Sequence, residues 1–314
     1  MHFIGRSKLG TEGQSVTPAK SAPALQAQAN TNPATIVAGL HFVATPIGAA
    51  RDITLRALDI LATADVLAAE DTRTLRHLME IHGISLGGRP LLPYHDHNGD
   101  TARPKLIDAL KAGKSVAYAS EAGTPLIADP GYQLARAAID EGFAVLAAPG
   151  PSAALCALNV SGLPTDRFFF AGFLPNKSAA RCQSLGALAH IPGSIIFYES
   201  PRRIAASLRD MLKVLGGNRQ AAVCREMTKR FEEITRGSLA ELAEIFGSKD
   251  VKGEIVVVVD RGAALVVDEE TVKDALNIAL NSHSVRDASA IVAEALGLPR
   301  RDVYQMALAM GKRA

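Results

Sequence analysis

The feature that most constrains the fold of this chain is a regular alternation of short apolar runs with amphipathic stretches, which begins near residue 38. Short apolar runs are typical of buried strands, and apolar residues that recur every three or four positions are typical of helices. Strands that alternate with helices form mostly parallel sheets whose two faces are both covered. The pattern therefore predicts an α/β protein.

The first part of the pattern predicts an N-terminal α/β domain over residues 38–163 with a mostly parallel sheet. Its strands are expected at residues 41–45, 66–69, 91–94, 115–120 and 144–147. Its helices are expected at residues 55–64, before 83, at 104–112, 132–141 and 152–160. The turn Gly162-Leu163-Pro164 is typical of a passage between domains, so the boundary is placed near Leu163.

The remaining chain predicts three further parts. A second α/β domain over residues 164–262 is expected to contain a mixed sheet, with strands near 168–171, 194–198, 221–225, 233–236 and 255–259 and helices at 178–189, 203–215 and 239–246. Residues 268–314 read as helix, tight turn and helix, which suits either a helix-turn-helix-like appendix or a plain packing hairpin. Residues 1–35 lack apolar periodicity, which is typical of a disordered N-terminal extension.

Composition excludes several classes of protein. The chain has 314 residues with 34 Lys and Arg against 32 Asp and Glu, so it is not a general polycation, and any nucleic-acid surface must be local. Three widely spaced cysteines favour neither a disulfide framework nor a zinc site. No apolar run is long enough to span a bilayer, and no secretory signal begins the chain. These features predict a soluble, cytoplasmic protein with no membrane partner.

Small residues follow the predicted strands of the first domain at several turns. Ligands of open α/β sheets bind at the carboxyl ends of strands, where glycine lets backbone groups approach a flat ligand. These turns predict a cofactor site made of Pro46, Gly48, Ser120, Glu121, Ala122, Gly123, Thr124, Pro149, Gly150, Pro151 and Ser152. Each turn alone could equally serve strand-to-helix geometry. Neither G-x-G-x-x-G nor a phosphate-binding loop is present.

Charged residues also lie at strand ends. Asp71 and Glu199 could orient a hydroxyl group and accept its proton, which makes them the candidate catalytic residues. Residues 202–236 hold nine basic and four acidic residues, an excess that could face RNA or simply be solvated. The predicted RNA contacts are Arg73, His95, His97, Lys177, Arg202, Arg203, Arg225 and Lys229. Pairing of the arginines with Glu70, Asp71, Glu199 and Glu226 is the alternative. Although His95 and His97 are spaced like metal ligands, no third ligand is near, so no metal is expected.

Nine strings of residues, in this order, resemble the ribosomal RNA small subunit methyltransferase I family of the tetrapyrrole methylase superfamily. They are TPIG-x-x-x-DIT (45–54), AEDTR (69–73), HDHN (95–98), AGTPLI-x-DPG (122–131), PGPSA (149–153), GLP-x-DRF (162–168), GFLP (172–175), FYESP-x-R (197–203) and KGE (252–254). The resemblance covers residues 40–261. Two positions depart from the family: Ala49-Ala50, where Asn-Leu is usual, and Glu121, where Asp is usual.

The resemblance implies a two-domain enzyme, a homodimer, that holds S-adenosylmethionine between its domains. It implies transfer of a methyl group to the ribose 2′-hydroxyl of a cytidine in 16S ribosomal RNA, so that the partner is this RNA or the small ribosomal subunit. Two alternatives remain open: a tetrapyrrole methylase, which would need a more apolar, aromatic pocket, and an RNA-binding assembly factor without turnover.

Overall fold

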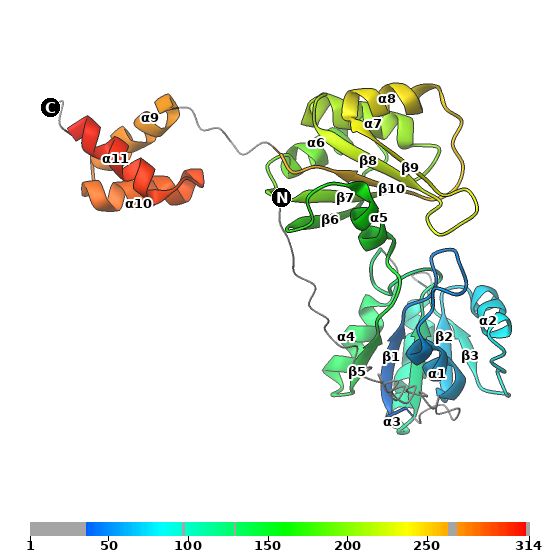
Figure 1. Cartoon of the computed structure of the whole chain (residues 1–314). Coiled ribbons are helices and arrows are strands. Elements are labelled where there is room, and N and C mark those ends of the chain that lie inside the picture. The colour runs from blue at the N-terminus through cyan, green and yellow to red at the C-terminus, as the bar shows by residue number, and fades with distance from the viewer. Residues whose placement is uncertain (1–35, 96–97, 129, 263–268, 312–314) are drawn as a thin grey trace, which may run out of the picture. The chain divides into compact units, whose positions relative to one another are not determined.

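The computed structural model describes residues 36–95, 98–128, 130–262 and 269–311. The predicted N-terminal extension over residues 1–35 and the predicted RNA contact His97 lie outside these residues. Two five-stranded sheets with their helices, and a C-terminal group of helices, make up the described chain (Figure 1). The α/β class predicted from the alternating pattern is confirmed. None of the described helices has the length and apolar character that crossing a membrane requires.

The first sheet is entirely parallel, with strand order β3-β2-β4-β1-β5. The central strands β1, β2 and β4 are buried along their whole length, which explains why they read as continuous apolar runs. The strands are β1 (Gly39–Val43), β2 (Val66–Ala69), β3 (Leu91–Pro93), β4 (Ser115–Ala119) and β5 (Val145–Ala148), and the helices are α1 (Leu55–Thr63), α2 (Thr72–Ile81), α3 (Gly99–Lys111) and α4 (Tyr132–Asp140).

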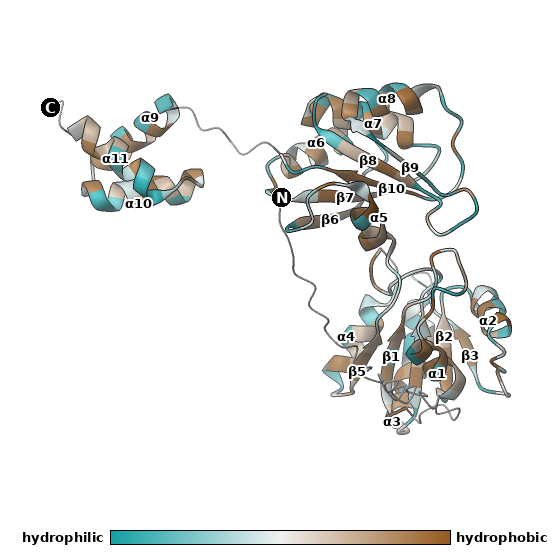
Figure 2. Cartoon of the chain, viewed as in Figure 1, coloured by the Kyte–Doolittle hydropathy of each residue, from teal (hydrophilic) through white to brown (hydrophobic). Residues whose placement is uncertain are grey.

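Helices cover both faces of this sheet because successive side chains of a strand point to opposite faces. On one face α1 and α2 pack against Val43, Leu67 and Ala117. On the other face α3 and α4 pack against Phe42 and Tyr118. Figure 2 shows the sheet as apolar between helices whose outer surfaces are hydrophilic. Helix α3 begins at Gly99, five residues before the predicted start at Pro104, so that this proline lies inside the helix.

The second sheet is mixed, as predicted, with strand order β6-β7-β10-β8-β9. Only β6 and β7 pair in parallel, and the other three pairs are antiparallel. Helices α6, α7 and α8 cover one face, where Leu185, Leu208 and Phe246 contact the strands. The strands are β6 (Phe168–Phe173), β7 (Ser194–Glu199), β8 (Gln220–Arg225), β9 (Glu233–Ser238) and β10 (Ile255–Val259), and the helices are α6 (Ser178–Leu188), α7 (Ile204–Leu215) and α8 (Leu239–Ser248).

Helix α5 (Ala153–Ser161) covers the other face of the second sheet. Its Ala154, Ala157 and Leu158 pack with residues of β7, β8 and β10 in one cluster. The predicted boundary near Leu163 assigns this helix to the first domain, whereas its apolar contacts assign it to the second. Its composition could not reveal this, since a helix that is apolar on several sides does not indicate which sheet it covers.

The C-terminal helices are α9 (Glu269–Leu280), α10 (Val285–Leu296) and α11 (Arg300–Gly311). Ser284 caps α10 by accepting a hydrogen bond from the Asp287 backbone amide, and Gly297 ends it in the left-handed conformation. Val272, Leu276, Val292 and Val303 form a core of their own between the three helices. This group is therefore a packed helical unit that contains the predicted helix, turn and helix.

Candidate functional site

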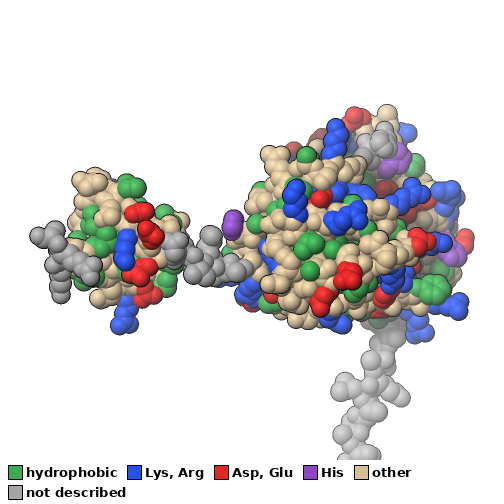
Figure 3. Space-filling model, turned by 90° about the horizontal axis from the view of Figure 1, so that it is seen from above, with side chains coloured by type: hydrophobic (Ala, Val, Ile, Leu, Met, Phe, Trp, Pro, Cys, Tyr) green, Lys and Arg blue, Asp and Glu red, His purple; other side chains and the backbone are tan. Residues whose placement is uncertain are grey.

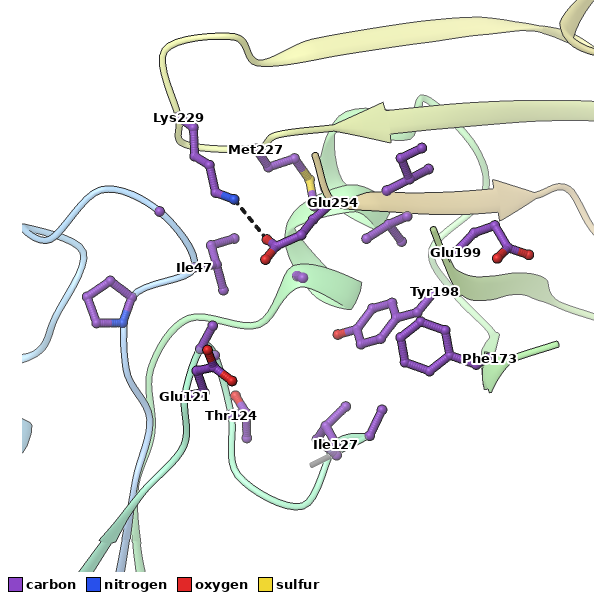
Figure 4. Close-up of a pocket in the computed structure, with 18 of the residues that line it drawn as sticks. Ile47, Glu121, Thr124, Ile127, Phe173, Tyr198, Glu199, Met227, Lys229 and Glu254 are labelled. Atoms are coloured by element: carbon purple, nitrogen blue, oxygen red, sulfur yellow. Dashed lines mark hydrogen bonds and ion pairs between the residues drawn. The ribbon is translucent and has the colours of Figure 1, made fainter. Parts of the chain in front are cut away.

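A cavity of about 560 Å³ lies at the carboxyl ends of β1 and β4, and strands β7 and β10 of the second sheet also contribute to its wall. Its volume is within the range of about 300–1,000 Å³ that small-molecule sites occupy. Figure 4 shows residues from both sheets around it. The lining residues are Pro46, Ile47, Gly48, Glu70, Thr74, Glu121, Ala122, Gly123, Thr124, Ile127, Ala128, Ala153, Phe173, Tyr198, Glu199, Met227, Lys229, Glu254, Ile255 and Val256.

The strand order explains why the cavity lies where it does. Strands β1 and β4 are neighbours, but the helices that follow them cover opposite faces of the sheet. Turns that leave in opposite directions open a crevice between two strands, which is where open α/β sheets bind their ligands. The site is therefore a consequence of topology as well as of the residues in its turns.

The turn after β4 forms one wall of the cavity, and hydrogen bonds hold its conformation. Ser120 is buried and donates a 2.5 Å hydrogen bond to the Gly123 carbonyl, while the Thr45 hydroxyl donates to the Ser120 carbonyl at 3.2 Å. Gly123 has φ +79°, a conformation that other residues adopt at a cost. Thr124 donates a 2.8 Å hydrogen bond to the Pro151 carbonyl. The turn thus presents its backbone to the cavity in one fixed conformation.

The predicted cofactor residues take two different places. Pro46, Gly48, Glu121, Ala122, Gly123 and Thr124 line the cavity. Ser120 and the turn of Pro149, Gly150, Pro151 and Ser152 are not among the lining residues, although the adjacent Ala153 is. They act as supports: a Cβ on Gly150 would come within 2.9 Å of the Ala44 Cβ. The sequence identifies all of these turns by their small residues. Only the packing distinguishes the turns that line the cavity from those that support them.

The loop after β8 closes the cavity from the second domain. Thr228 accepts a 3.1 Å hydrogen bond from the Ala49 amide, and a Cβ on Gly48 would lie 2.6 Å from the Thr228 hydroxyl. Glu226 and Thr228 both have positive φ, which is uncommon for residues with side chains. Because Ala49 takes part through its backbone, its departure from the usual family residue leaves this contact in place.

Lys229 is the one cation among the residues that line the cavity. Its ammonium group donates 2.9 Å hydrogen bonds to Glu226 and Glu254 (Figure 4). Burial works to lower the pKa of Lys229, but the bonds to the two carboxylates outweigh burial and the net pKa is raised. The charge of Lys229 is therefore held inside the site by two neighbours, and the predicted contact with RNA phosphates is not supported by this geometry.

The two predicted catalytic carboxylates are both held by neighbouring groups, and only Glu199 is among the residues that line the cavity. Asp71 caps α2, and hydrogen bonds from the side chain and backbone of Arg73 lower its pKa to about 2, so it is a very weak base. The Glu199 side chain is fully buried and accepts hydrogen bonds from Ser207 at 2.5 Å and the Ser200 amide at 2.9 Å. Both groups organise the backbone around the site.

Two predicted RNA contacts are also structural. Arg203 lies 3.2 Å from Glu199 and donates hydrogen bonds to Asn176 and the Leu174 carbonyl. Arg225 donates to the Glu233 carboxylate at 3.0 and 3.1 Å. Internal pairing, the alternative interpretation of this basic segment, therefore describes these arginines, although Arg225 pairs with Glu233 and not with Glu226.

Other basic residues remain available to solvent. Arg202 and Lys177 are exposed, and no ion pair involves either within the described residues. Arg73 is exposed but paired with Asp71. His95 lines a separate cavity of about 300 Å³ with Tyr94, Arg103 and Tyr132. Figure 3 shows Lys and Arg side chains scattered over the visible face, with acidic and apolar side chains between them.

The described residues contain no group of three or more His, Cys, Asp or Glu that could hold a metal ion.

The sequence analysis did not select several residues that line the cavity. Ile127, Phe173, Tyr198, Met227, Glu254 and Val256 belong to this set. Some lie within the matched strings AGTPLI-x-DPG, GFLP, FYESP-x-R and KGE, so the signal was present. The apolar and aromatic members of this set read as core in a sequence, because nothing local distinguishes a cavity wall from a packed interior.

Two family models match the chain. The model for tetrapyrrole (corrin/porphyrin) methylases matches residues 39–243, and the model described as the RsmI C-terminal HTH domain matches residues 266–311. A curated relative from Mesorhizobium japonicum, ribosomal RNA small subunit methyltransferase I, is 49% identical over 271 residues, which are 86% of this chain and 91% of the relative.

Two solved structures share the fold. A crystal structure of diphthine synthase aligns with a TM-score of 0.56 at 17% identity, over 70% of this chain and 89% of the other. Uroporphyrin-III C-methyl transferase from Thermus thermophilus, complexed with S-adenyl homocysteine, aligns with a TM-score of 0.50 at 18% identity, over 71% of this chain and 97% of the other.

Proposed function

Because this chain belongs to the tetrapyrrole methylase family and, within it, to the ribosomal RNA small subunit methyltransferase I group, we propose that it methylates 16S ribosomal RNA with S-adenosylmethionine. The acceptor is the 2′-hydroxyl of a cytidine ribose, in the RNA itself or in the small ribosomal subunit. The observation that carries this proposal is the cavity at the crevice between β1 and β4, whose wall is a glycine turn.

The lining of the cavity fits the methyl donor. Glu70, Glu121 and Glu254 are carboxylates, and the single cation Lys229 is already paired, so the lining suits a ligand that carries a positive sulfonium. Ile47, Met227 and Val256 supply apolar surface for a flat base. We propose that Pro46, Gly48, Glu121, Ala122, Gly123 and Thr124 hold the cofactor, with Ser120 and the 149–152 turn as their support.

When bound, S-adenosylmethionine supplies a methyl group that is activated by its positive sulfur. The protein must bring the ribose hydroxyl into line with this group, exclude water and accept the hydroxyl proton. Asp71 and Glu199 are unsuited to this last role because of the low pKa of Asp71 and the burial of Glu199. We propose that Glu70 and Glu121, which line the cavity, orient the hydroxyl group.

The same surface limits the alternatives. The faces of a tetrapyrrole ring need a large apolar, aromatic surface, whereas this cavity is lined by several carboxylates and only two aromatic residues, Phe173 and Tyr198. An assembly factor without turnover would keep the fold but transfer no methyl group.

We also propose that the protein acts as a homodimer, which the resemblance to its family supports and which sedimentation at micromolar concentration tests.

One experiment separates these functions. Tritiated S-adenosylmethionine is incubated with the protein and with small subunits from a strain that lacks the gene, and the ribose methyl group is mapped by primer extension at low nucleotide concentration. We expect label in the RNA and a stop at a single cytidine. Label in an added tetrapyrrole, or the absence of label in RNA, would contradict the proposal.

A further inference from the structure

An exposed phenyl ring stands at the mouth of the cavity. Phe173 is the last residue of β6, is 58% exposed and lines the cavity. Isolated exposed apolar side chains are common and need no explanation. Phe173 differs because it is both exposed to solvent and part of the lining of the cavity that contains the glycine turn.

A break in the sheet turns this ring toward the cavity. The pairing of β6 with β7 runs regularly to Phe170 opposite Ile196 and then skips Ala171, so that Phe173 lies opposite Tyr198. Had the register continued unchanged, Phe173 would lie opposite Glu199, on the face of the sheet where Glu199 bonds to Ser207 of α7. Gly172 has φ +64°, which suits such a bulge, and bulges commonly re-aim side chains beside functional sites.

The ring is also held in place. Phe173 meets Tyr198 edge to face with 5.6 Å between ring centroids, and Tyr198 meets Phe170 in the same way at 4.9 Å. Tyr198 is itself partly buried and packs against the core cluster that includes Ala154 and Ile196. The outer face of the Phe173 ring remains open, and Ile127, itself exposed, lies on the other side of the opening (Figure 4).

We propose that Phe173 is the platform on which the base of the target nucleotide stacks while its ribose enters the cavity. The inference rests on the proposed function and specifies how the substrate is held. Proteins that act on single nucleotides of RNA present aromatic rings to unstacked bases, since every base has a π face. Ile127 supplies a second apolar wall. Phe173 is a positioning residue, because it touches the base and not the reacting oxygen.

The position of the ring favours the RNA base over the cofactor as its ligand. The cofactor is assigned to the glycine turn of the first domain, where Gly123 is buried. Phe173 belongs to the opposite wall and keeps more than half of its surface in solvent. Loss of the ring should therefore weaken the use of RNA while leaving cofactor affinity unchanged.

The test is steady-state methylation of unmethylated small subunits by Phe173→Ala, Phe173→Leu and Phe173→Trp. We expect kcat/KM for RNA to fall roughly 5- to 150-fold in Phe173→Ala, the range for loss of one stacked base. Phe173→Leu should behave like Phe173→Ala, because leucine has apolar bulk but no π face. Phe173→Trp should retain activity. Phe169→Ala is the matched control: Phe169 is 43% exposed on the same strand but lies on the opposite face.

Three outcomes would overturn the inference. One is a normal kcat/KM in Phe173→Ala. Another is full activity in Phe173→Leu, which would make the ring a plain apolar wall. The third is a parallel loss of S-adenosylmethionine affinity by calorimetry, which would place the ring against the cofactor. The melting temperature should not change in any variant. If the wild-type protein itself transfers no methyl group to RNA, the proposed function fails and this inference fails with it. The same assay includes the wild-type protein and therefore distinguishes this outcome from the other three.

Discussion

Thr45 and Gly123 exchange both of their backbone hydrogen bonds, at 2.9 and 3.0 Å, across the crevice between the ends of β1 and β4. The two residues belong to turns that leave the sheet in opposite directions, and this bridge joins the two turns together with the hydrogen bond from the Thr45 hydroxyl to the Ser120 carbonyl. Ile47 and Gly123 both line the cavity, and a Cβ on Gly123 would lie 3.3 Å from the Ile47 side chain. A substitution in either turn is therefore expected to alter the conformation of the other.

Gly123→Ala should lower the affinity for S-adenosylmethionine by about tenfold or more, equivalent to about 1.4 kcal/mol. The new Cβ would lie 3.3 Å from Ile47 in a backbone with φ +79°, so the turn must shift. Gly142→Ala is the matched control, because Gly142 also has φ +79° but has no atom near its Cβ. Both variants should lose about 1–2 kcal/mol of stability. Equal cofactor affinity by calorimetry in the two variants would refute the placement of the cofactor.

Glu199→Gln should lower the melting temperature markedly, whereas Glu121→Gln should lower kcat with little effect on melting. Glu199 is buried and bonded to Ser207, Ser200 and Arg203, and removal of one partner from a buried pair costs about 3–5 kcal/mol. The value should fall at the lower end, since Arg203 is partly exposed. The opposite pattern, with kcat lost in a stable Glu199→Gln protein, would restore Glu199 as a catalytic residue.

Arg202→Ala should alter the salt dependence of RNA binding, whereas Arg225→Ala should alter thermal stability. Arg202 is exposed, so its loss should reduce the slope of log K for RNA against log salt by about 0.7–0.9, the contribution of one phosphate contact. Arg225 is 19% exposed and paired with Glu233, so its loss should lower the melting temperature and leave the salt slope unchanged. Thermal melts and salt titrations of both proteins decide this, and a reduced slope in Arg225→Ala would show that its pairing is broken on RNA.

Asp71→Asn should alter the response of stability to acid. Hydrogen bonds from Arg73 lower the pKa of Asp71 in the folded protein to about 2, against an ordinary value of 3.8. The stabilisation is therefore complete above about pH 4 and is lost as pH falls toward 2. The melting temperature of the wild-type protein should exceed that of Asp71→Asn by a constant amount between pH 8 and 5, and the difference should shrink below pH 4. A difference independent of pH would show that capping, and not charge, is what matters.

The sequence predicted the elements well because their signals are local. Strand β2 spans residues 66–69 as expected, and β10 spans 255–259, since an apolar run between turns specifies a buried strand by itself. Helix α8 begins at a capping box in which Ser238 and Glu241 bond reciprocally, which depends on residues three apart. The turn sequences likewise identified residues that line one wall of the cavity.

The roles of the charged residues depended on distant partners. Lys229 is held by Glu254, 25 positions away, and Thr228 by the Ala49 amide, 179 positions away. Whether such a residue faces a ligand or another side chain depends on which groups the fold brings within bonding distance. The sequence contains both partners but no sign of their approach.

What the sequence by itself determined is therefore the class of fold, the family and the glycine turns, since these depend on periodicity and on short strings of residues. Only the tertiary structure decided that Glu199 is buried and bonded to Ser207, that Arg225 is paired, and that a bulge after Phe170 turns Phe173 toward the opening. The physical reason is that one residue of register reverses the direction of a side chain, and the free energy that selects a register is distributed over the contacts of the whole sheet.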